Sequence, residues 1–178
     1  STQAKTLFPY TTLFRSGAKL LFMGNEFAAT QEWDYQSELQ WDLLQHKSHG
    51  GMKHCVQQLN TLYKAHPALY ELQYDVGGFE WVETNKRQEG IIAFKRKGKE
   101  PKEEILVVLN MTPVPRHQFP IHVYGKTVWK QVFNSDDKAF WGVGDLTNQE
   151  VKGISVDGTN HWQVLHLELP ALAAVVFK

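Results

Sequence analysis

The second half of the chain alternates short apolar runs with clusters of Gly, Pro, Asn and Asp. Runs of this length and spacing are typical of an all-β sandwich or barrel, because each cluster marks a turn between antiparallel strands. The pattern predicts strands over Phe79–Val82, Ile91–Arg96, Ile105–Asn110, His117–Val123, Val128–Phe133, Val164–Leu169 and Ala171–Phe177.

The first half follows a different pattern. Lys19–Met23 is a nearly continuous apolar run that ends at Gly24, which indicates a strand buried on both faces of a parallel sheet. A polar, acidic and aromatic segment with no clean period follows up to Gly51. Apolar positions then recur at helical spacing, which predicts an amphipathic helix over Gly51–His66 that ends before Pro67.

Strand, loop and helix together make one β/α unit, which cannot close a sheet by itself. We therefore expect residues 17–76 to be the last unit of a truncated (β/α)8 barrel, and residues 77–178 to be a separate all-β domain. The helix is expected to bury Cys55, Val56, Leu59 and Tyr63 against Leu20–Met23. The β domain is expected to fold on its own.

The N-terminus lacks the charged and apolar regions of a signal peptide. Residues 6–16 instead resemble the translation of a sequencing-library adapter. We therefore expect residues 1–16 to be an artefactual or disordered leader, and the natural gene to begin further upstream.

Composition excludes several partners. Lys and Arg number 19, Asp and Glu also number 19, and the balanced charge argues against a nucleic-acid or membrane-surface partner. The longest apolar run, Ala171–Phe177, is far too short to span a bilayer. The chain's one cysteine, Cys55, forbids an internal disulfide and fits a reducing compartment, so we expect a cytoplasmic protein.

The long loop carries the candidate chemistry. It interleaves carboxylates with Trp and Tyr, a combination that suits a sugar site because aromatic rings stack on pyranose faces and carboxylates accept hydroxyl hydrogen bonds. Loops at the C-terminal ends of barrel strands are also where barrel active sites lie. The candidate substrate-binding residues that this pattern selects are Glu26, which directly follows the end of the predicted strand, Trp33 and Trp41.

No metal or cofactor site is expected. His46, His49 and His54 lie near Cys55, but neither a C-x-x-C nor an H-E-x-x-H motif is present, and Cys55 falls on the apolar face of the predicted helix. The sequence also has no Gly-rich phosphate loop.

Several segments, in order, resemble the C-terminal end of the bacterial 1,4-α-glucan (glycogen) branching enzymes, a family of the α-amylase superfamily (glycoside hydrolase family 13). The segments are Lys19–Ala28, Glu32–Leu44, Gln58–Tyr63, Pro67–Leu69, Gly78–Trp81, Asn110–Arg116, Phe133–Asp136 and Leu167–Leu172. The resemblance runs from about Gly17 to Lys178 and implies the last barrel unit followed by an antiparallel β-sandwich. Two stretches, Ala28–Thr30 and Asp34–Gln36, differ from the sequence that is commoner in this loop of the family.

The resemblance implies an enzyme that transfers an α-1,4-glucan segment to a 6-hydroxyl through a covalent glycosyl intermediate. The family's three catalytic carboxylates lie on earlier barrel strands, so no residue here inherits a catalytic role and the chain alone is expected to be inactive. What the resemblance carries over is Gly24-Asn25-Glu26 at the edge of the site, which adds Asn25 to the candidate substrate-binding residues. The implied partner is glycogen or amylose, bound by a full-length enzyme that is expected to be monomeric.

Two alternatives remain open at this point. One is a stand-alone carbohydrate-binding module that uses surface tryptophans such as Trp129, Trp141 and Trp162, which the strand and helix of Leu20–His66 disfavour. The other is a fragment of a hydrolytic α-amylase relative, which would differ mainly in acceptor sites outside this chain.

Overall fold

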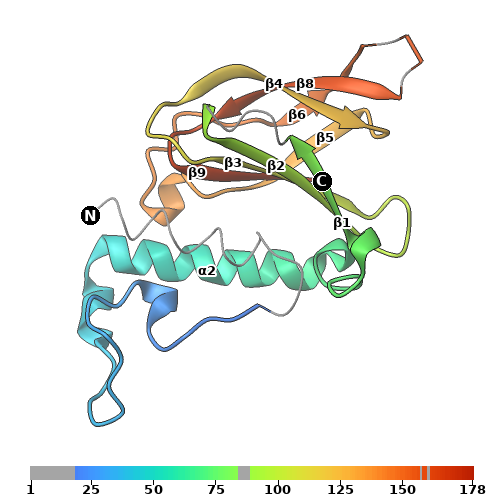
Figure 1. The fold of residues 1–178 in the computed structure, drawn as a ribbon. Helices are drawn as coiled ribbons and strands as arrows, with labels where there is room; N and C mark the ends of the chain where they lie inside the picture. Colours follow the sequence, from blue (N-terminus) through green and yellow to red (C-terminus); the bar gives the residue numbers. More distant parts are fainter. Residues whose placement is uncertain (1–18, 84–88, 157, 160) are drawn as a thin grey trace.

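The computed structural model describes residues 19–83, 89–156, 158–159 and 161–178, so the expected leader at residues 1–16 lies outside them. The described part forms three layers, with a long helix below a large sheet and a small sheet above it (Figure 1). The helix is α2 (Lys47–Ala65), and the strands are β1 (Phe79–Glu83), β2 (Ile91–Lys97), β3 (Glu104–Asn110), β4 (Arg116–Tyr124), β5 (Val128–Asn134), β6 (Glu150–Lys152), β7 (Ile154–Ser155), β8 (Trp162–Leu169) and β9 (Ala173–Phe177).

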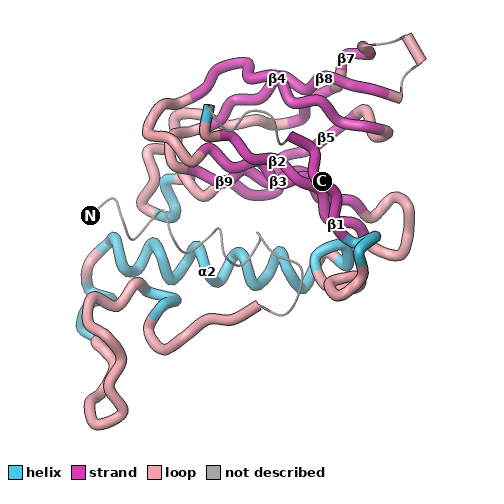
Figure 2. Tube along the Cα trace, viewed as in Figure 1, coloured by secondary structure: helices cyan, strands magenta, loops and turns pink. Residues whose placement is uncertain are grey.

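Both sheets are antiparallel throughout the described residues. The large one has the strand order β1-β2-β3-β9-β5-β6, and the small one has the order β4-β8-β7 (Figure 2). β2 and β3 pair along their whole length, from Ile91 opposite Asn110 to Lys97 opposite Glu104. β3 also pairs with β9, so these two strands lie at the centre of the large sheet.

Two hydrophobic clusters hold the three layers together, because alternate residues of a strand face opposite sides of its sheet. The upper cluster lies between the sheets and includes Ile121 of β4, Leu165 of β8 and Val108 of β3. The lower cluster lies between the large sheet and α2, and joins Cys55, Leu59 and Leu62 to the strands. The strand members of the lower cluster are Phe94, Ile105, Val107, Leu109, Phe133, Ala174 and Val176.

The sequence pattern placed the strands well. All seven predicted strands are present, and the antiparallel all-β architecture is confirmed. The sequence analysis missed β6 and β7, which are two or three residues long and have no buried position. A strand this short leaves no alternation of apolar and polar positions to detect.

Two predictions about the first half are wrong. Lys19–Met23 forms no strand, and Leu20 is 82% exposed, because no parallel neighbour is available in the described residues to satisfy its backbone groups. The predicted helix is present and buries Cys55, Val56 and Leu59, while Tyr63 is half-buried. However, its apolar face packs on the sheet of the β domain rather than on Leu20–Met23.

A carboxylate braces the bulge in the small sheet. The pairing of β4 with β8 shifts between Arg116 and Phe119, and Gln118 adopts a φ of 48° there. Glu168 accepts hydrogen bonds from Gln118 N (3.2 Å), Gln118 Nε2 (2.7 Å) and His117 Nδ1 (2.8 Å). Burial raises the pKa of Glu168, but the hydrogen bonds from Gln118 and His117 outweigh it and hold the pKa below its usual value of 4.5.

Replacing this carboxylate is expected to make the small sheet less stable in a pH-dependent way. Because the pKa of Glu168 is lower in the folded protein, its stabilisation is present above pH 4.5 and is lost as the pH falls below that value. Glu168→Gln should therefore lower the free energy of unfolding by on the order of 1 kcal/mol at pH 7. The difference from the parent should narrow at pH 3.5 in urea unfolding. The exposed Glu150→Gln is the matched control, and a difference that stays constant with pH would contradict this role.

Candidate functional site

The candidate site lies on the segment between Lys19 and His46, which folds along one side of α2 (Figure 1). Two short 3₁₀ turns shape it, η1 (Asn25–Phe27) and η2 (Trp41–Gln45). Phe27 is fully buried and anchors η1, while His49 Nδ1 of α2 donates to the Phe27 carbonyl at 2.9 Å. The carbonyl can only accept, so this contact places the proton of a neutral His49 on Nδ1.

Asn25 and Glu26 are held in a tight turn at the start of this segment. Gly24 adopts a φ of 81°, and its carbonyl accepts from Phe27 N (3.2 Å) and Ala29 N (3.0 Å). A Cβ at Gly24 would lie 2.8 Å from Ala29 Cβ, so glycine is required both for the conformation and for the close approach. Asn25 and Glu26 are half-buried in this turn.

Trp33 and Trp41 each keep one part of the indole accessible. Trp33 is 40% exposed and packs edge-on against Phe22, with ring centroids 5.5 Å apart. Trp41 is 44% exposed and leans on buried Phe27 at 5.1 Å. A ring supported on one side and open on the other suits stacking on a sugar face.

A single side chain closes the loop that carries Trp33. Gln40 Oε1 accepts from Thr30 N (3.0 Å), Thr30 Oγ1 (3.2 Å) and Gln31 N (3.1 Å). The hollow beside Trp33 has a volume of about 20 Å³, which is room for about one water molecule. Asn25, Glu26 and Trp41 do not line it, so the four candidate residues share one segment but not one pocket.

The described residues contain no group of three His, Cys, Asp or Glu side chains placed to hold a metal ion. His46 and His49 have ring centroids 6.2 Å apart, and Cys55 is buried in the lower cluster. No helix in the described part of the chain has the length and apolar character needed to cross a membrane.

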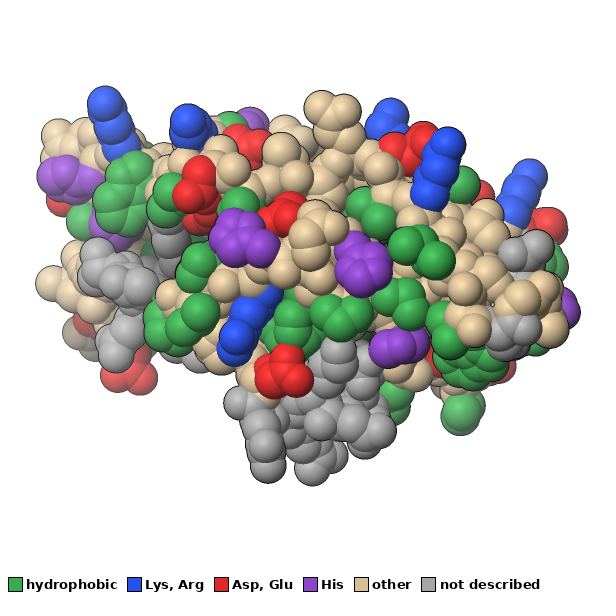
Figure 3. Space-filling view, turned by 90° about the horizontal axis from the view of Figure 1, so that it is seen from above, with side chains coloured by type: hydrophobic (Ala, Val, Ile, Leu, Met, Phe, Trp, Pro, Cys, Tyr) green, Lys and Arg blue, Asp and Glu red, His purple; other side chains and the backbone are tan. Residues whose placement is uncertain are grey.

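The tryptophans of the alternative binding module are not equivalent. Trp129 is fully buried between the sheets and its Nε1 donates to the Lys126 carbonyl, so its expected place on the surface is wrong. Trp141 and Trp162 are 45% and 48% exposed. Trp162 lies opposite Tyr124 on the outer face of the small sheet, where Figure 3 shows histidine side chains beside hydrophobic ones.

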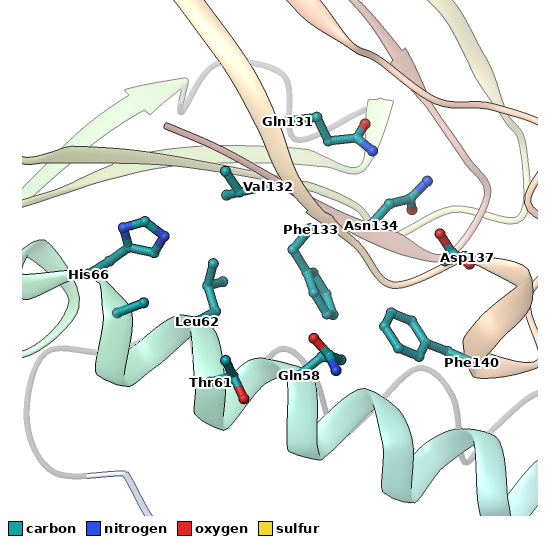
Figure 4. A pocket seen from close by; sticks show the side chains of 11 residues that line it. Gln58, Thr61, Leu62, His66, Gln131, Val132, Phe133, Asn134, Asp137 and Phe140 are labelled. Carbon is teal, nitrogen blue, oxygen red and sulfur yellow. The ribbon is translucent and has the colours of Figure 1, made fainter.

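A hollow that the sequence analysis missed lies between α2 and β5 (Figure 4). Its volume is about 400 Å³, and it combines residues of the helix with residues more than 60 positions later in the chain. Phe133–Asp136 was noted only as part of a family resemblance. No local signal in the sequence indicates that this segment faces Gln58 and Thr61.

Comparison with known families decides the class of the β domain. Residues 81–178 match the model of the "Alpha amylase, C-terminal all-beta domain". The chain belongs to this family. The α-amylase C-terminal domain therefore accounts for β2 to β9 and most of β1, and for both sheets of the sandwich.

Longer relatives of this α-amylase C-terminal domain protein are named branching enzymes. The chain is 40% identical over 164 residues to the 1,4-alpha-glucan branching enzyme GlgB of Aquifex aeolicus, which is 91% of this chain and 26% of that protein. It is also 40% identical over 168 residues to the GlgB of Methylococcus capsulatus, which is 94% of this chain and 22% of that protein. The chain thus spans about a quarter of the length of these relatives.

Solved structures share the fold at low sequence identity. An α-amylase from H. orenii matches with a TM-score of 0.57 and 15% identity, over 99% of this chain and 35% of that one. AmyP in complex with maltose matches with a TM-score of 0.59 and 15% identity, over 99% of this chain and 34% of that one. Both matches extend beyond the β domain to the helix and the loop before it.

Proposed function

We propose that this chain is the C-terminal part of a 1,4-α-glucan branching enzyme, which transfers an α-1,4-glucan segment to a 6-hydroxyl and thereby forms α-1,6 branches. The observation that carries the proposal is the 40% identity to branching enzymes, which extends over the loop and helix as well as the β domain. A relationship confined to the β domain would leave other members of the α-amylase superfamily equally well supported.

In this proposal, the segment up to α2 is the end of the catalytic barrel, and α2 is its last helix. The catalytic carboxylates belong to the part of the relatives that this chain does not span. Retaining transfer needs two carboxyl groups about 5–5.5 Å apart across one sugar. The acids of the loop, from Glu26 to Asp42, lie on one segment with no opposing wall among the described residues, so we assign none of them a catalytic role.

We propose that Asn25, Glu26, Trp33 and Trp41 contact the glucan at the edge of that site. The half-buried Asn25 and Glu26 are fixed by the Gly24 turn, so their polar groups can orient sugar hydroxyls at little cost in entropy. The partly exposed indoles supply apolar faces for pyranose rings. The proposed ligand is therefore an uncharged glucan chain such as amylose or glycogen.

The activity test uses amylose, with new α-1,6 linkages measured by debranching and chain-length analysis. The chain alone should form no new linkages, because it lacks the proposed catalytic nucleophile and most of the cleft that would hold the acceptor glucan. A hybrid that joins the preceding residues of the Aquifex aeolicus relative to this chain should branch amylose. Branching by the chain alone, or release of short sugars without branching by the hybrid, would contradict the proposal.

Site variants in the hybrid test the glucan contacts. Trp41→Ala and Glu26→Gln should each lower branching by about tenfold, which corresponds to about 1.4 kcal/mol of lost transition-state stabilisation. Tyr35→Ala is the matched aromatic control, because Tyr35 lies on the same segment with 78% exposure and no stacked neighbour ring among the described residues. Equal activities of all three variants would remove these residues from the site.

A further inference from the structure

Arg96 of β2 is a buried cation that the described part of the fold does not neutralise. Its side chain is 2% exposed, and Nε, Nη1 and Nη2 have no hydrogen-bond partner among the described residues. The ion pairs formed by those residues do not include it either. Burying a charge without a partner is costly, and native proteins leave few such groups unsatisfied. An acceptor therefore belongs beside this guanidinium.

Arg96 lies on the face of the large sheet that α2 covers. Its strand partners are Phe79 of β1 and Ile105 of β3, and Ile105 belongs to the lower cluster. On the helix side lies Tyr63, in the last turn of α2, whose hydroxyl donates to Gln73 Oε1 at 3.3 Å. The walls around the guanidinium are thus mainly aromatic and aliphatic, and they supply no carboxylate.

The burial of Arg96 restricts what the acceptor can be. A side chain with 2% exposure offers no open route to an anion that diffuses in from solvent. The acceptor must instead belong to a polypeptide segment that folds together with this sheet. A carboxylate suits the position best, because it pairs with a guanidinium through two parallel hydrogen bonds and cancels its charge.

Lys19 indicates the direction from which such a segment comes. Lys19 is half-buried, and the positive charge of Arg96 lowers its pKa in addition to the effect of burial, so the two cations lie near each other. Polypeptide joined ahead of Lys19 therefore passes within reach of Arg96. Two neighbouring positive charges also favour an acidic group between them.

Apolar side chains beside Arg96 are left uncovered in the same region. Trp81 of β1 is 51% exposed and packs edge-on against Phe79, with ring centroids 4.9 Å apart. Val76 is 92% exposed in η4 (Val76–Gly78), which contacts β2. Leu20, next to Lys19, is 82% exposed. Apolar residues around a buried charged anchor are typical of the centre of an interface.

The proposed enzyme has a large part to place on this surface. The branching enzymes at 40% identity match this chain over only 26% and 22% of their length. A second copy of the chain fits less well, because a preformed surface cannot reach a guanidinium that is already closed off. A segment that folds with the sheet can reach it.

We infer that Arg96 anchors this chain to the part of the enzyme that precedes Lys19, through a carboxylate that this part contributes. The apolar residues beside that carboxylate cover Trp81, Val76 and Leu20. The inference rests on the proposed function, which supplies the preceding part. Arg96 touches no substrate in this assignment, so it is a positioning residue that holds the β domain against the barrel.

The test measures melting temperatures of Arg96→Met in two settings. In this chain alone the variant should melt several degrees higher, because the guanidinium has no acceptor. In hybrids that join the preceding residues of the Aquifex aeolicus or Methylococcus capsulatus relative to this chain, it should melt several degrees lower, because removing one partner leaves a buried carboxylate unpaired. Arg96→Lys should lose less than Arg96→Met in the hybrids, since it keeps the charge.

Lys130→Met is the matched control, because Lys130 is an exposed cation on β5 and should leave both settings unchanged. The acceptor is then identified by replacing the acidic residues of the preceding part with their amides, one at a time. The replacement that lowers the melting temperature of the hybrid, but not of its Arg96→Met variant, marks the partner of Arg96.

Two outcomes would overturn the inference. One is a higher melting temperature for Arg96→Met in both hybrids, as in the chain alone. The other is stabilisation of the chain alone by acetate, by phosphate or by higher protein concentration that Arg96→Met abolishes, which would make the acceptor a free anion or a second copy. Branching of amylose by the same hybrids is a separate readout. Branching with a stabilising Arg96→Met refutes the anchor alone, and a destabilising Arg96→Met without branching refutes the proposed activity alone.

Discussion

A chain shortened to begin at Asp75 is expected to lose its cooperative unfolding transition and to aggregate. The lower cluster joins α2 to the large sheet, so removing the helix exposes Phe94, Ile105, Val107 and Leu109 to water. Exposing a large apolar side chain costs about 1.5–3 kcal/mol, and four of them approach the whole stability of a domain, about 5–15 kcal/mol. This result would replace the sequence-based expectation that the β domain folds on its own.

The matched comparison is a chain shortened to begin at His46, which loses the loop but keeps α2. It should retain a single thermal transition by circular dichroism and elute as one species in size-exclusion chromatography. Its melting temperature should fall modestly, because η1 also packs against α2. If the chain from Asp75 melts as sharply as the chain from His46, then the helix is not part of the folded core.

The strands could be predicted because their side chains alternate, but the docking of the helix could not. The apolar face of α2 is clear from Cys55, Val56 and Leu59, yet an apolar stripe does not say which surface covers it. The nearest candidate in the sequence was Lys19–Met23. A sheet formed from residues 79–177 covers the helix instead, because it offers a complete, hydrogen-bonded surface, while Lys19–Met23 pairs with no strand among the residues that the structure describes.

Trp129 shows a second limit of the sequence pattern. Trp129 and Phe133 are four residues apart, so a regular strand would place them on the same face. The register of β5 against β9 shifts between Gln131 and Phe133, and this bulge reverses the alternation. Trp129 therefore belongs to the upper cluster and Phe133 to the lower one. A single inserted residue of this kind leaves no mark in the hydrophobic pattern.

The same distinction between local sequence pattern and packing applies to the candidate functional residues. Asn25, Glu26, Trp33 and Trp41 lie on one continuous segment. Residue type and order were enough to select Glu26, Trp33 and Trp41, the family resemblance added Asn25, and the role of all four stays a prediction. The hollow between α2 and β5 pairs Gln58 with Asn134, which are brought together only when α2 docks on the sheet. Contacts between distant segments depend on packing rather than on local pattern, so the sequence alone did not indicate this hollow.

Replacing Arg96 by Met is expected to raise the stability of this chain. Arg96 lies on β2 between Phe79 of β1 and Ile105 of β3, and it is only 2% exposed. Its Nε, Nη1 and Nη2 atoms have no hydrogen-bond partner among the described residues. Burial lowers the pKa of the Arg96 guanidinium, and nearby Tyr63 opposes this effect. The pKa of Lys19 is lowered by burial and further by the positive charge of Arg96.

A buried cation without acceptors costs free energy that an apolar side chain of similar length does not. Arg96→Met should therefore increase the free energy of unfolding by about 1–4 kcal/mol, the range found when buried charges give way to well-packed apolar groups. At about 2–4 °C per kcal/mol for a chain of this size, the melting temperature should rise by several degrees.

The neighbouring Lys95→Met is expected to have the opposite effect. Lys95 is 1% exposed, but its Nζ donates to the Tyr124 carbonyl at 3.0 Å and lies 3.5 Å from Glu104 Oε2 and 3.7 Å from Glu80 Oε1. Removing the Lys95 ammonium takes a positive charge away from the partly buried carboxylates of Glu104 and Glu80. The free energy of unfolding should therefore fall by about 1–3 kcal/mol. Thermal unfolding of the two variants compares Lys95, a buried cation with hydrogen-bonding and ionic partners, with Arg96, a buried cation with no hydrogen-bond partner in the described part of the chain. A lower melting temperature for Arg96→Met would mean that its guanidinium has an acceptor and contributes to the fold as Lys95 does.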